Sequence, residues 1–332
     1  MAVPASGTSA RRDGRPQHRR TYAALDLGTN NCRLLIARPD PSGNGFVIVD
    51  AFSRIVRLGE GMAASGRISD VAVERALAAL SVCADKLVRR GVSLSRAVAT
   101  EACRQAENGR AFVERVYRET GIALEIIDPG EEARLAVAGC ATLLDDGDGP
   151  ALVFDIGGGS TELVELHGSR FDHEFRRWIS VPWGVVSLSE SEPGPLPTAE
   201  ARVAAYLRMR DRVVHSLGDF AARGGEPLRM LGTSGTVTTL ASVYLGLPSY
   251  ERRAVDGLRV PAGELRDICR RLASMSVPER ARIPCIGPER SDLVVAGCAI
   301  LEAILDLWPA DVVGVADRGI REGILRSLMG QA

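Results

Sequence analysis

Lysine is almost absent from this chain, because only Lys86 among its 41 lysine and arginine residues is a lysine. Lys86 lies in the run VERALAALSVCADKLVRR, whose apolar residues recur with helical spacing, and we expect it to be solvated there. No GxxxxGK[ST] motif occurs. We therefore expect neither Schiff-base chemistry nor a P-loop, and any phosphate must be bound by arginine, by backbone N–H groups or through a metal.

Histidine is scarce, and cysteine lacks the spacing of a metal site. The seven cysteines are an odd number, dispersed and without a CxxC pair, so neither a disulfide framework nor a zinc site is predicted. The four histidines lie outside the motifs described below, and no catalytic role is expected for them. They are His18, His167, His173 and His215.

Long apolar runs and an excess of one charge are also missing. No stretch approaches the roughly 18 apolar residues of a membrane span, and no apolar segment follows the arginines of residues 1–20. The formal net charge is −1, so no global field favours nucleic acid or an anionic membrane as a partner. We expect a cytoplasmic protein with a disordered basic tail over residues 1–20.

The chain does contain an internal repeat: the sequence pattern of its first strand–turn–strand segment occurs a second time. Aligning Asp26 with Asp155 superimposes two strand–turn–strand patterns, places Gly28 on Gly157 and places Arg33 on Glu162. The repeat predicts two α/β halves, each starting with a β-meander, with the ligand site in the cleft between them. Helices are expected over 70–90, 109–121, 199–217, 263–275 and 291–308. The expected domains are 21–148 and 149–316, with a helix at about 317–330 that can return to the first domain.

The second copy of the repeat carries three consecutive glycines in LVFDIGGGSTELVEL. A dinucleotide-binding loop is not expected, because the sixth position is Glu162 and TELVEL alternates like a strand. Glycines in a strand–turn–strand context can expose successive N–H groups as an anion-binding nest, the alternative being a hairpin without a ligand. Asp155 and Glu162 would flank this nest and repel each other unless a cation lay between them, which favours Mg²⁺ bound to phosphate.

Seven ordered motifs carry a family resemblance over about residues 21–330. They are ALDLGTNNCRLLIAR, ATEACRQAENG, DPGEEARLAVAG, DIGGGSTEL, GTSGT, GPERSDLVVAG and ADRGIREGIL. Together they resemble the Ppx/GppA exopolyphosphatase and guanosine pentaphosphatase family, within the actin, Hsp70 and sugar-kinase superfamily. The resemblance implies duplicated actin-like (ribonuclease-H-like) domains with a central active-site cleft, a Mg²⁺ or Mn²⁺ cofactor and a homodimer. It also implies a short form without the C-terminal HD-like helical extension of longer members, which puts high processivity in doubt.

The resemblance assigns roles residue by residue. It implies that Glu132 is the catalytic carboxylate and that Asp155 and Glu162 serve the metal. Arg104 is expected to be catalytic through its contact with phosphate. For Asn30 and Ser160, too, the resemblance implies contact with phosphate. The glycine turns, the loop at 233–236 and the anionic substrate add further expected phosphate-binding residues: Gly28, Thr29, Gly157, Gly158, Gly159, Ser234, Gly235 and Arg290.

The segment DPGEEAR supports the assignment of the base. Asp128 is expected to cap a helix that begins at Pro129, and Glu131 falls where a capping box needs a glutamate. Glu132 has no such role and is placed to accept a proton from an attacking water, the alternative being a solvated helix glutamate.

Two further segments leave alternatives open. Arg104 follows the predicted strand at 95–100 in a loop-like segment, where it can neutralise phosphate oxygens or form a surface salt bridge. The loop at 233–236 can form a second nest or a plain strand-to-helix cap.

Together with the family resemblance, these residues predict a hydrolase that releases terminal phosphate from inorganic polyphosphate by means of a glutamate-activated water. The alternative is a guanosine pentaphosphate (pppGpp) 5′-phosphohydrolase, which needs the same hydrolytic groups. A kinase or Hsp70-like ATPase and a nucleotide sensor without turnover are less favoured. No specific nucleic acid and no membrane is expected as a partner.

Overall fold

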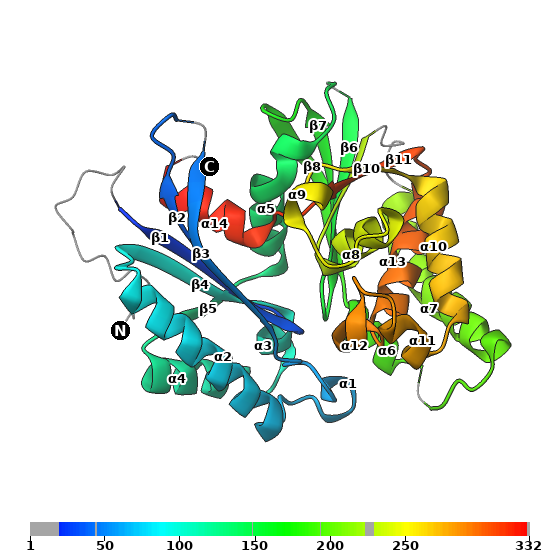
Figure 1. The fold of residues 1–332 in the computed structure, drawn as a ribbon, viewed down its shortest axis with the longest axis horizontal. Coiled ribbons are helices and arrows are strands. Elements are labelled where there is room, and N and C mark those ends of the chain that lie inside the picture. Colours follow the sequence, from blue (N-terminus) through cyan, green and yellow to red (C-terminus); the bar gives the residue numbers. More distant parts are fainter. Residues whose placement is uncertain (1–19, 44, 148, 193, 223–228, 331–332) are drawn as a thin grey trace. The chain divides into compact units, whose positions relative to one another are not determined.

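The computed structural model describes residues 20–330 except 44, 148, 193 and 223–228, so the basic tail predicted for residues 1–20 lies almost wholly outside it. The chain divides into two compact units (Figure 1). Unit 1 is Met1–Asp128 with Ile320–Ala332, and unit 2 is Pro129–Gly319. Over the part of the chain that is described, no helix is both long and apolar enough to cross a membrane.

Unit 1 contains a five-stranded sheet in the order β3-β2-β1-β4-β5. The first three strands form an antiparallel meander, and β1, β4 and β5 run parallel. The strands are β1 (Tyr22–Leu27), β2 (Asn31–Pro39), β3 (Phe46–Ile55), β4 (Leu94–Ala99) and β5 (Leu124–Ile126). The helices are α1 (Met62–Ser65), α2 (Asp70–Arg89), α3 (Glu101–Gln105), α4 (Gly109–Thr120) and α14 (Ile320–Leu328).

The helices of unit 1 cover both faces of its sheet. Helix α2 begins at the side-chain cap Ser69, and α4 ends at Gly121, whose φ of 71° is the left-handed conformation that glycine adopts most easily. Figure 1 shows α2 and α4 on one face and α14 on the other. The C-terminal helix therefore packs with unit 1.

Lys86 on α2 is less solvated than the sequence predicts. Its side chain is 22% exposed and its Nζ lies 2.7 Å from Oδ1 of Asp50 on β3. The expectation of a solvated lysine is wrong, because the acidic residue on the neighbouring strand draws the ammonium group against the sheet.

Unit 2 contains a six-stranded sheet in the order β10-β11-β9-β6-β7-β8. Strands β6, β7 and β8 form an antiparallel meander, and β6, β9 and β11 run parallel. The strands are β6 (Pro150–Ile156), β7 (Thr161–Gly168), β8 (His173–Val181), β9 (Arg229–Thr233), β10 (Arg259–Pro261) and β11 (Val312–Ala316). The helices are α5 (Pro129–Cys140), the 3₁₀ helix η2 (Ala141–Leu143), α6 (Val185–Glu190), α7 (Ala199–Ala221), α8 (Gly235–Tyr244), α9 (Arg252–Val255), α10 (Ala262–Ser274), α11 (Val277–Ala281), α12 (Gly287–Arg290) and α13 (Val294–Leu307).

Alternation along β6 divides the core of unit 2 into two layers. Ala151 and Val153 pack in the cluster that includes α5, whereas Leu152 and Phe154 pack in the cluster of α7, α8, α10 and α13. Because α5 packs on this sheet, the boundary between the compact units falls before it, whereas the boundary expected from sequence was 148/149.

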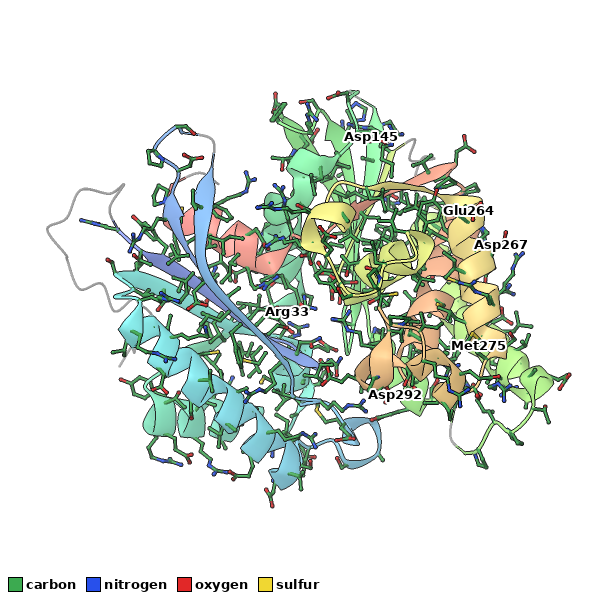
Figure 2. All side chains as sticks on the ribbon, in the orientation of Figure 1. Arg33, Asp145, Glu264, Asp267, Met275 and Asp292 are labelled. Atoms are coloured by element: carbon green, nitrogen blue, oxygen red, sulfur yellow. The ribbon has the colours of Figure 1, made fainter. Side chains whose placement is uncertain are left out.

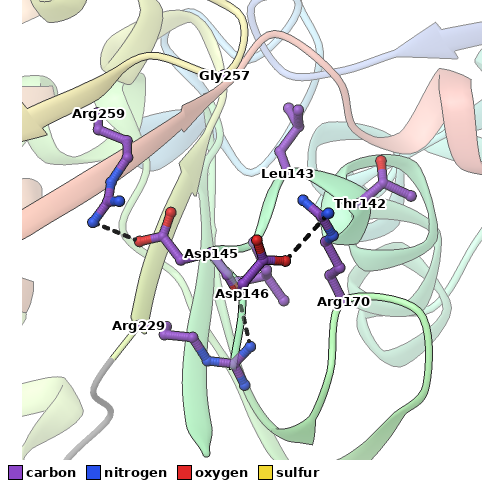
Figure 3. A pocket seen from close by; sticks show the side chains of 9 residues that line it. Thr142, Leu143, Asp145, Asp146, Arg170, Arg229, Gly257 and Arg259 are labelled. Atoms are coloured by element: carbon purple, nitrogen blue, oxygen red, sulfur yellow. Dashed lines mark hydrogen bonds and ion pairs between the residues drawn. The ribbon is translucent and has the colours of Figure 1, made fainter. Parts of the chain in front are cut away.

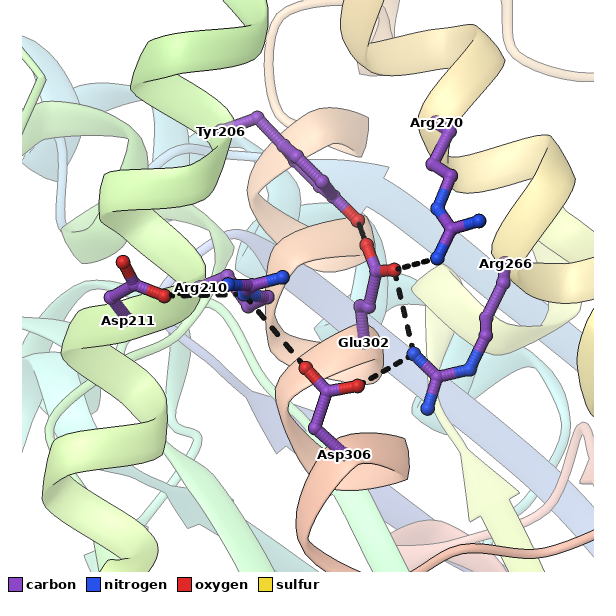
Figure 4. A network of polar contacts seen from close by, with 7 residues as sticks. All are labelled: Tyr206, Arg210, Asp211, Arg266, Arg270, Glu302 and Asp306. Atoms are coloured by element: carbon purple, nitrogen blue, oxygen red, sulfur yellow. Dashed lines mark hydrogen bonds and ion pairs between the residues drawn. The ribbon is translucent and has the colours of Figure 1, made fainter.

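A polar network joins three helices of unit 2 (Figure 4). The hydroxyl group of Tyr206 on α7 donates to Glu302 on α13, whose other oxygen lies 3.4 Å from Arg266 and 3.2 Å from Arg270 on α10. Glu302 is 2% exposed, so these partners are what make its burial tolerable. Burial raises the pKa of Tyr206 and keeps the phenol protonated as a donor.

The two sheets share one topology. Strand order β3-β2-β1-β4-β5 in unit 1 matches β8-β7-β6-β9-β11 in unit 2, with the same antiparallel and parallel pairings. The duplication predicted from the repeat is therefore present in the fold.

Candidate active site

The three glycines form the tight turn between β6 and β7. The backbone N–H of Gly157 donates to Ser160 O at 2.9 Å and closes the turn. Two N–H groups at the start of α6, those of Val185 and Val186, donate to the carbonyls of Gly157 and Gly158 at 3.0 and 2.8 Å. The turn is thus held by its own backbone and by α6.

Three backbone N–H groups of this turn make no backbone hydrogen bond within the described residues. Within the described residues, no acceptor is found for the backbone N–H of Gly158, Gly159 or Ser160. The hydroxyl-bearing Ser160 is 3% exposed. Successive N–H groups without acceptors are compatible with an anion-binding nest, and anion binding at this turn stays a prediction.

Asp155 and Glu162 are direct cross-strand neighbours. They are paired in the β6–β7 register, so both side chains project from the α5 face of the sheet. Glu162 is 3% exposed, and its Oε1 accepts a hydrogen bond from Ser180 Oγ at 2.7 Å. Two carboxylates held side by side fit a divalent cation, and Mg²⁺ is commonly bound by one or two carboxylates together with water and phosphate oxygens. No cluster of three or more histidine, cysteine, aspartate or glutamate side chains that could hold a metal ion occurs among the described residues.

The corresponding pair in unit 1 joins an acidic residue to a basic one. Asp26 is paired in register with Arg33 on β2, which Figure 2 labels, at the positions that the repeat aligns with Asp155 and Glu162. Burial raises the pKa of Asp26, while Arg33 and Arg321 oppose that shift. Unit 1 therefore supplies its own cation beside the aspartate, whereas unit 2 presents a second carboxylate. Asp26 was given no role from sequence, although its alignment with Asp155 could have indicated one.

Glu132 lies in the first turn of α5, which begins at Pro129 as predicted. Glu132 is only 7% exposed, so the alternative of a solvated helix glutamate does not hold. Helix α5 is followed by η2 and β6, and its residues Ala133 and Val137 pack in the same buried cluster as Val153 of β6. A buried carboxylate near a helix N-terminus can hold a negative charge and accept a proton.

The first copy of the turn repeats this backbone geometry in unit 1. The N–H of Gly28 donates to Asn31 O at 2.9 Å, and the carbonyls of Thr29 and Asn30 accept from the segment at 56–59. Thr29 Oγ1 and Asn30 Oδ1 are buried, and neither has a hydrogen-bond partner in the described part of the chain. Buried polar atoms without partners are expected where a ligand or water belongs.

Arg104 lies on the short helix α3, so the predicted loop at this position is wrong. Its Nε donates to Glu101 Oε2 at 3.0 Å and its Nη1 to Ile127 O at 2.7 Å. These contacts place Arg104 at the carboxyl ends of β4 and β5. Since β1 runs parallel to β4, the turn after Leu27 lies at the same edge of the sheet. Arg104 therefore forms a salt bridge with Glu101, but a largely buried one and not the surface salt bridge that was one alternative. The salt bridge orients the guanidinium group.

The loop after β9 combines a helix cap with backbone strain. Ser234 caps α8 by accepting from Thr236 N at 3.3 Å, as one of the two alternatives predicts. Its φ of 103° is one that non-glycine residues rarely adopt, and such strain tends to occur at ligand-binding sites. Arg290 donates to Thr239 Oγ1 at 2.7 Å and thereby joins α12 to α8.

Comparisons of the sequence and of the fold with known proteins both find the Ppx/GppA phosphatase family. The model of the Ppx/GppA phosphatase family matches residues 35–332. Exopolyphosphatase 2 of Mycobacterium tuberculosis is 32% identical over 330 residues, which cover 93% of this chain and 98% of that protein. The guanosine-5′-triphosphate,3′-diphosphate pyrophosphatase of Aeromonas salmonicida is 30% identical over 310 residues, covering 93% of this chain and 59% of that protein.

A solved structure of the Ppx/GppA family member from Aquifex aeolicus superposes with a TM-score of 0.75 and 30% identity. The match covers 94% of this chain and 98% of that chain. The predicted fold class, duplicated actin-like α/β domains, is thereby confirmed.

Proposed function

Because this chain belongs to the Ppx/GppA phosphatase family, we propose that it is an exopolyphosphatase that hydrolyses the terminal phosphoanhydride bond of inorganic polyphosphate. The observation that carries the proposal is the arrangement around the second glycine turn. The N–H groups of the turn and the paired Asp155 and Glu162 lie at the same end of one sheet, and α5, which carries the buried Glu132, packs on that sheet.

In the proposed reaction, the N–H groups of the turn and the hydroxyl of Ser160 bind the terminal phosphate. Asp155 and Glu162 would hold Mg²⁺ or Mn²⁺, which neutralises phosphate charge when bound. Glu132 accepts a proton from water as the water oxygen attacks the terminal phosphorus. The bond from phosphorus to the bridging oxygen breaks, and inorganic phosphate leaves a chain shortened by one unit.

Residues of unit 1 are also proposed to bind phosphate. Gly28, Thr29 and Asn30 present the second copy of the nest, and the buried Thr29 hydroxyl can donate to a phosphate oxygen. Arg104 would spread positive charge over the equatorial oxygens. Ser234, Gly235 and Arg290 of unit 2 would contact more distant phosphates.

A second candidate substrate is the 5′ phosphate of guanosine pentaphosphate. The similarity to the Aeromonas enzyme favours it, and the hydrolytic groups would be the same. We further propose a homodimer, on the basis of the family resemblance, and a cytoplasmic location.

Two adjacent glutamates test the assignment of the base. Glu132→Gln should lose about 10²–10⁴ in kcat, because an amide cannot accept the proton, while KM changes little. Glu131→Gln is the matched control, since an amide at the capping-box position can still bond to the helix N-terminus, and its kcat should be nearly unchanged. Circular dichroism establishes that both variants are folded. An inactive Glu131→Gln beside a normal Glu132→Gln would overturn the assignment.

A further inference from the structure

Unit 2 contains a pocket of about 570 Å³ at the end of its sheet opposite the glycine turn (Figure 3). The first residues of β6 and β9 and the last residue of β7 lie at this end of the sheet. The glycine turn joins β6 to β7 at the other end. Six of the lining residues carry the inference: Thr142, Asp145, Asp146, Arg170, Arg229 and Arg259.

Arg229, the first residue of β9, is a buried residue of the pocket lining. It is 7% exposed, and its two terminal nitrogens donate to the carbonyls of Asp145, Gly147, Gly149 and Gly168. These bonds hold the loop before β6 against the end of β7. The remaining donor, the Nε–H, is buried and has no partner among the described residues.

Two more buried polar atoms of the pocket share this property. Arg170 Nε and Thr142 Oγ1 are buried and lack a hydrogen-bond partner within the described chain. A buried donor without an acceptor costs roughly 1–3 kcal/mol, so three such atoms around one pocket indicate a missing ligand. An arginine Nε–H can only donate, and the ligand must therefore supply acceptor atoms.

The charges around the pocket favour an anion. Three arginines face two aspartates, with Arg259 paired to Asp145 at 3.0 Å and Arg170 to Asp146 at 3.2 Å. The Asp146 side chain is 85% exposed, and an ion pair so open to solvent contributes little stability. An incoming anion can therefore replace Asp146 on Arg170 at small cost.

We propose that this pocket is a second binding site, separate from the glycine turn, for a small oxyanion. Guanidinium groups match phosphate and carboxylate oxygens equally in geometry, and the volume also accommodates an oxyanion carried on a small organic molecule. Because the site lies at the other end of β6, its occupancy does not depend on the proposed catalytic function.

The test follows the Nε–H signals of arginine by NMR in the full chain, in EDTA. Inorganic phosphate, glycerol 3-phosphate and succinate are titrated separately, to distinguish free phosphate, a phosphate ester and a carboxylate. Arg170→Gln assigns the Arg170 signal by its loss. We expect that signal to shift with at least one of the three probes and to saturate.

Arg259→Gln should weaken that binding by about tenfold or more, as loss of a charge-assisted contact does. Arg176→Gln is the matched control, since Arg176 lies on the neighbouring β8, is 54% exposed and pairs with Glu174 outside the pocket. Thermal melts establish that the variants are folded. The proposal is overturned if no probe shifts the Arg170 signal, or if the binding is the same in Arg259→Gln and Arg176→Gln.

Discussion

At the residue scale, the two copies of the repeat differ most at one cross-strand pair. Asp26 faces Arg33 in the first copy, and Asp155 faces Glu162 in the second. Directly opposed like charges destabilise a sheet, and the proposed cation would relieve this repulsion in the second copy. This difference accounts for the proposal of a metal at unit 2 alone.

The pair predicts a stability effect that is independent of activity. In EDTA, Asp155→Asn should melt at or above the temperature of the parent, because it removes the repulsion with Glu162. Added Mg²⁺ should raise the melting temperature of the parent and leave that of the variant unchanged. Asp219→Asn, at an exposed position of α7, serves as the control and should follow the parent. An equal Mg²⁺ shift in parent and Asp155→Asn would contradict a metal at this pair.

Sequence predicted the turns well and side-chain environments less well. The glycine turn and the helix start at Pro129 follow from local spacing, and both are present. The burial of Glu132 and the contact of Arg104 with Ile127 O depend on segments distant in sequence, so spacing alone could not predict them. The roles of these residues in catalysis stay predictions.

At the scale of elements, the approach of α6 to the glycine turn leaves no room for a side chain. A Cβ atom on Gly184 would lie 2.3 Å from Gly158 C and 2.5 Å from Gly159 N, and these are backbone atoms that cannot move aside alone. In the first copy a glycine also approaches the turn closely, but there the nearest atom belongs to a side chain: a Cβ on Gly59 would lie 2.2 Å from Thr29 Cγ2. In both halves a glycine from a later segment supports the turn.

Gly184→Ala should therefore displace the nest. We expect a loss of roughly 1–3 kcal/mol in the free energy of unfolding and a fall in kcat/KM on polyphosphate. Gly218→Ala is the matched control, because no atom lies within 4 Å of its added Cβ in α7 and a helical alanine is favoured by up to about 1 kcal/mol. Urea denaturation and phosphate release measure both effects. If Gly184→Ala behaves like Gly218→Ala, the turn is not held in the way described.

The contact between α2 and β3 predicts a pH dependence. Lys86 and Arg90 lower the pKa of Asp50 to about 2, from an ordinary value near 3.8. A carboxyl group with a lowered pKa contributes its full stabilisation at pH values above its ordinary pKa. This stabilisation is lost as the pH falls through the lowered pKa. Asp50→Asn should cost roughly 1–2 kcal/mol at pH 7, and the difference from the parent should vanish near pH 2.

Urea denaturation at several pH values checks this expectation, with Asp85→Asn on the exposed side of α2 as the control. A destabilisation by Asp50→Asn that is the same at pH 7 and at pH 2 would show that the ion pairs are not its cause.

Most long elements were predictable because their periodicity is strong. The helices α2, α4, α7, α10 and α13 fall where the apolar spacing places them. The expected domain boundary at 148/149 rests on the loop LLDDGDGP, yet α5 before that loop packs on the sheet that follows it. The packing partner of a helix is a tertiary property that loop composition does not encode.

At the scale of the whole molecule, duplication gives each half a glycine turn between its first two strands. In the proposed function, the N–H groups of these turns would take the place of a P-loop lysine, and arginine would supply the remaining positive charge. The C-terminal helix α14 packs on β1 of unit 1, so the chain ends in the unit in which it begins.

The measurement that tests the central claim most directly is phosphate release by the purified full chain. Medium-chain polyphosphate, long-chain polyphosphate, guanosine pentaphosphate and ATP are compared side by side at equal concentration of terminal phosphate, with Mg²⁺ and with excess EDTA. We predict that polyphosphate has the highest kcat/KM, that guanosine pentaphosphate is the next best substrate and that EDTA abolishes turnover. ATP as the best substrate by a wide margin, or full turnover in EDTA, would contradict the account.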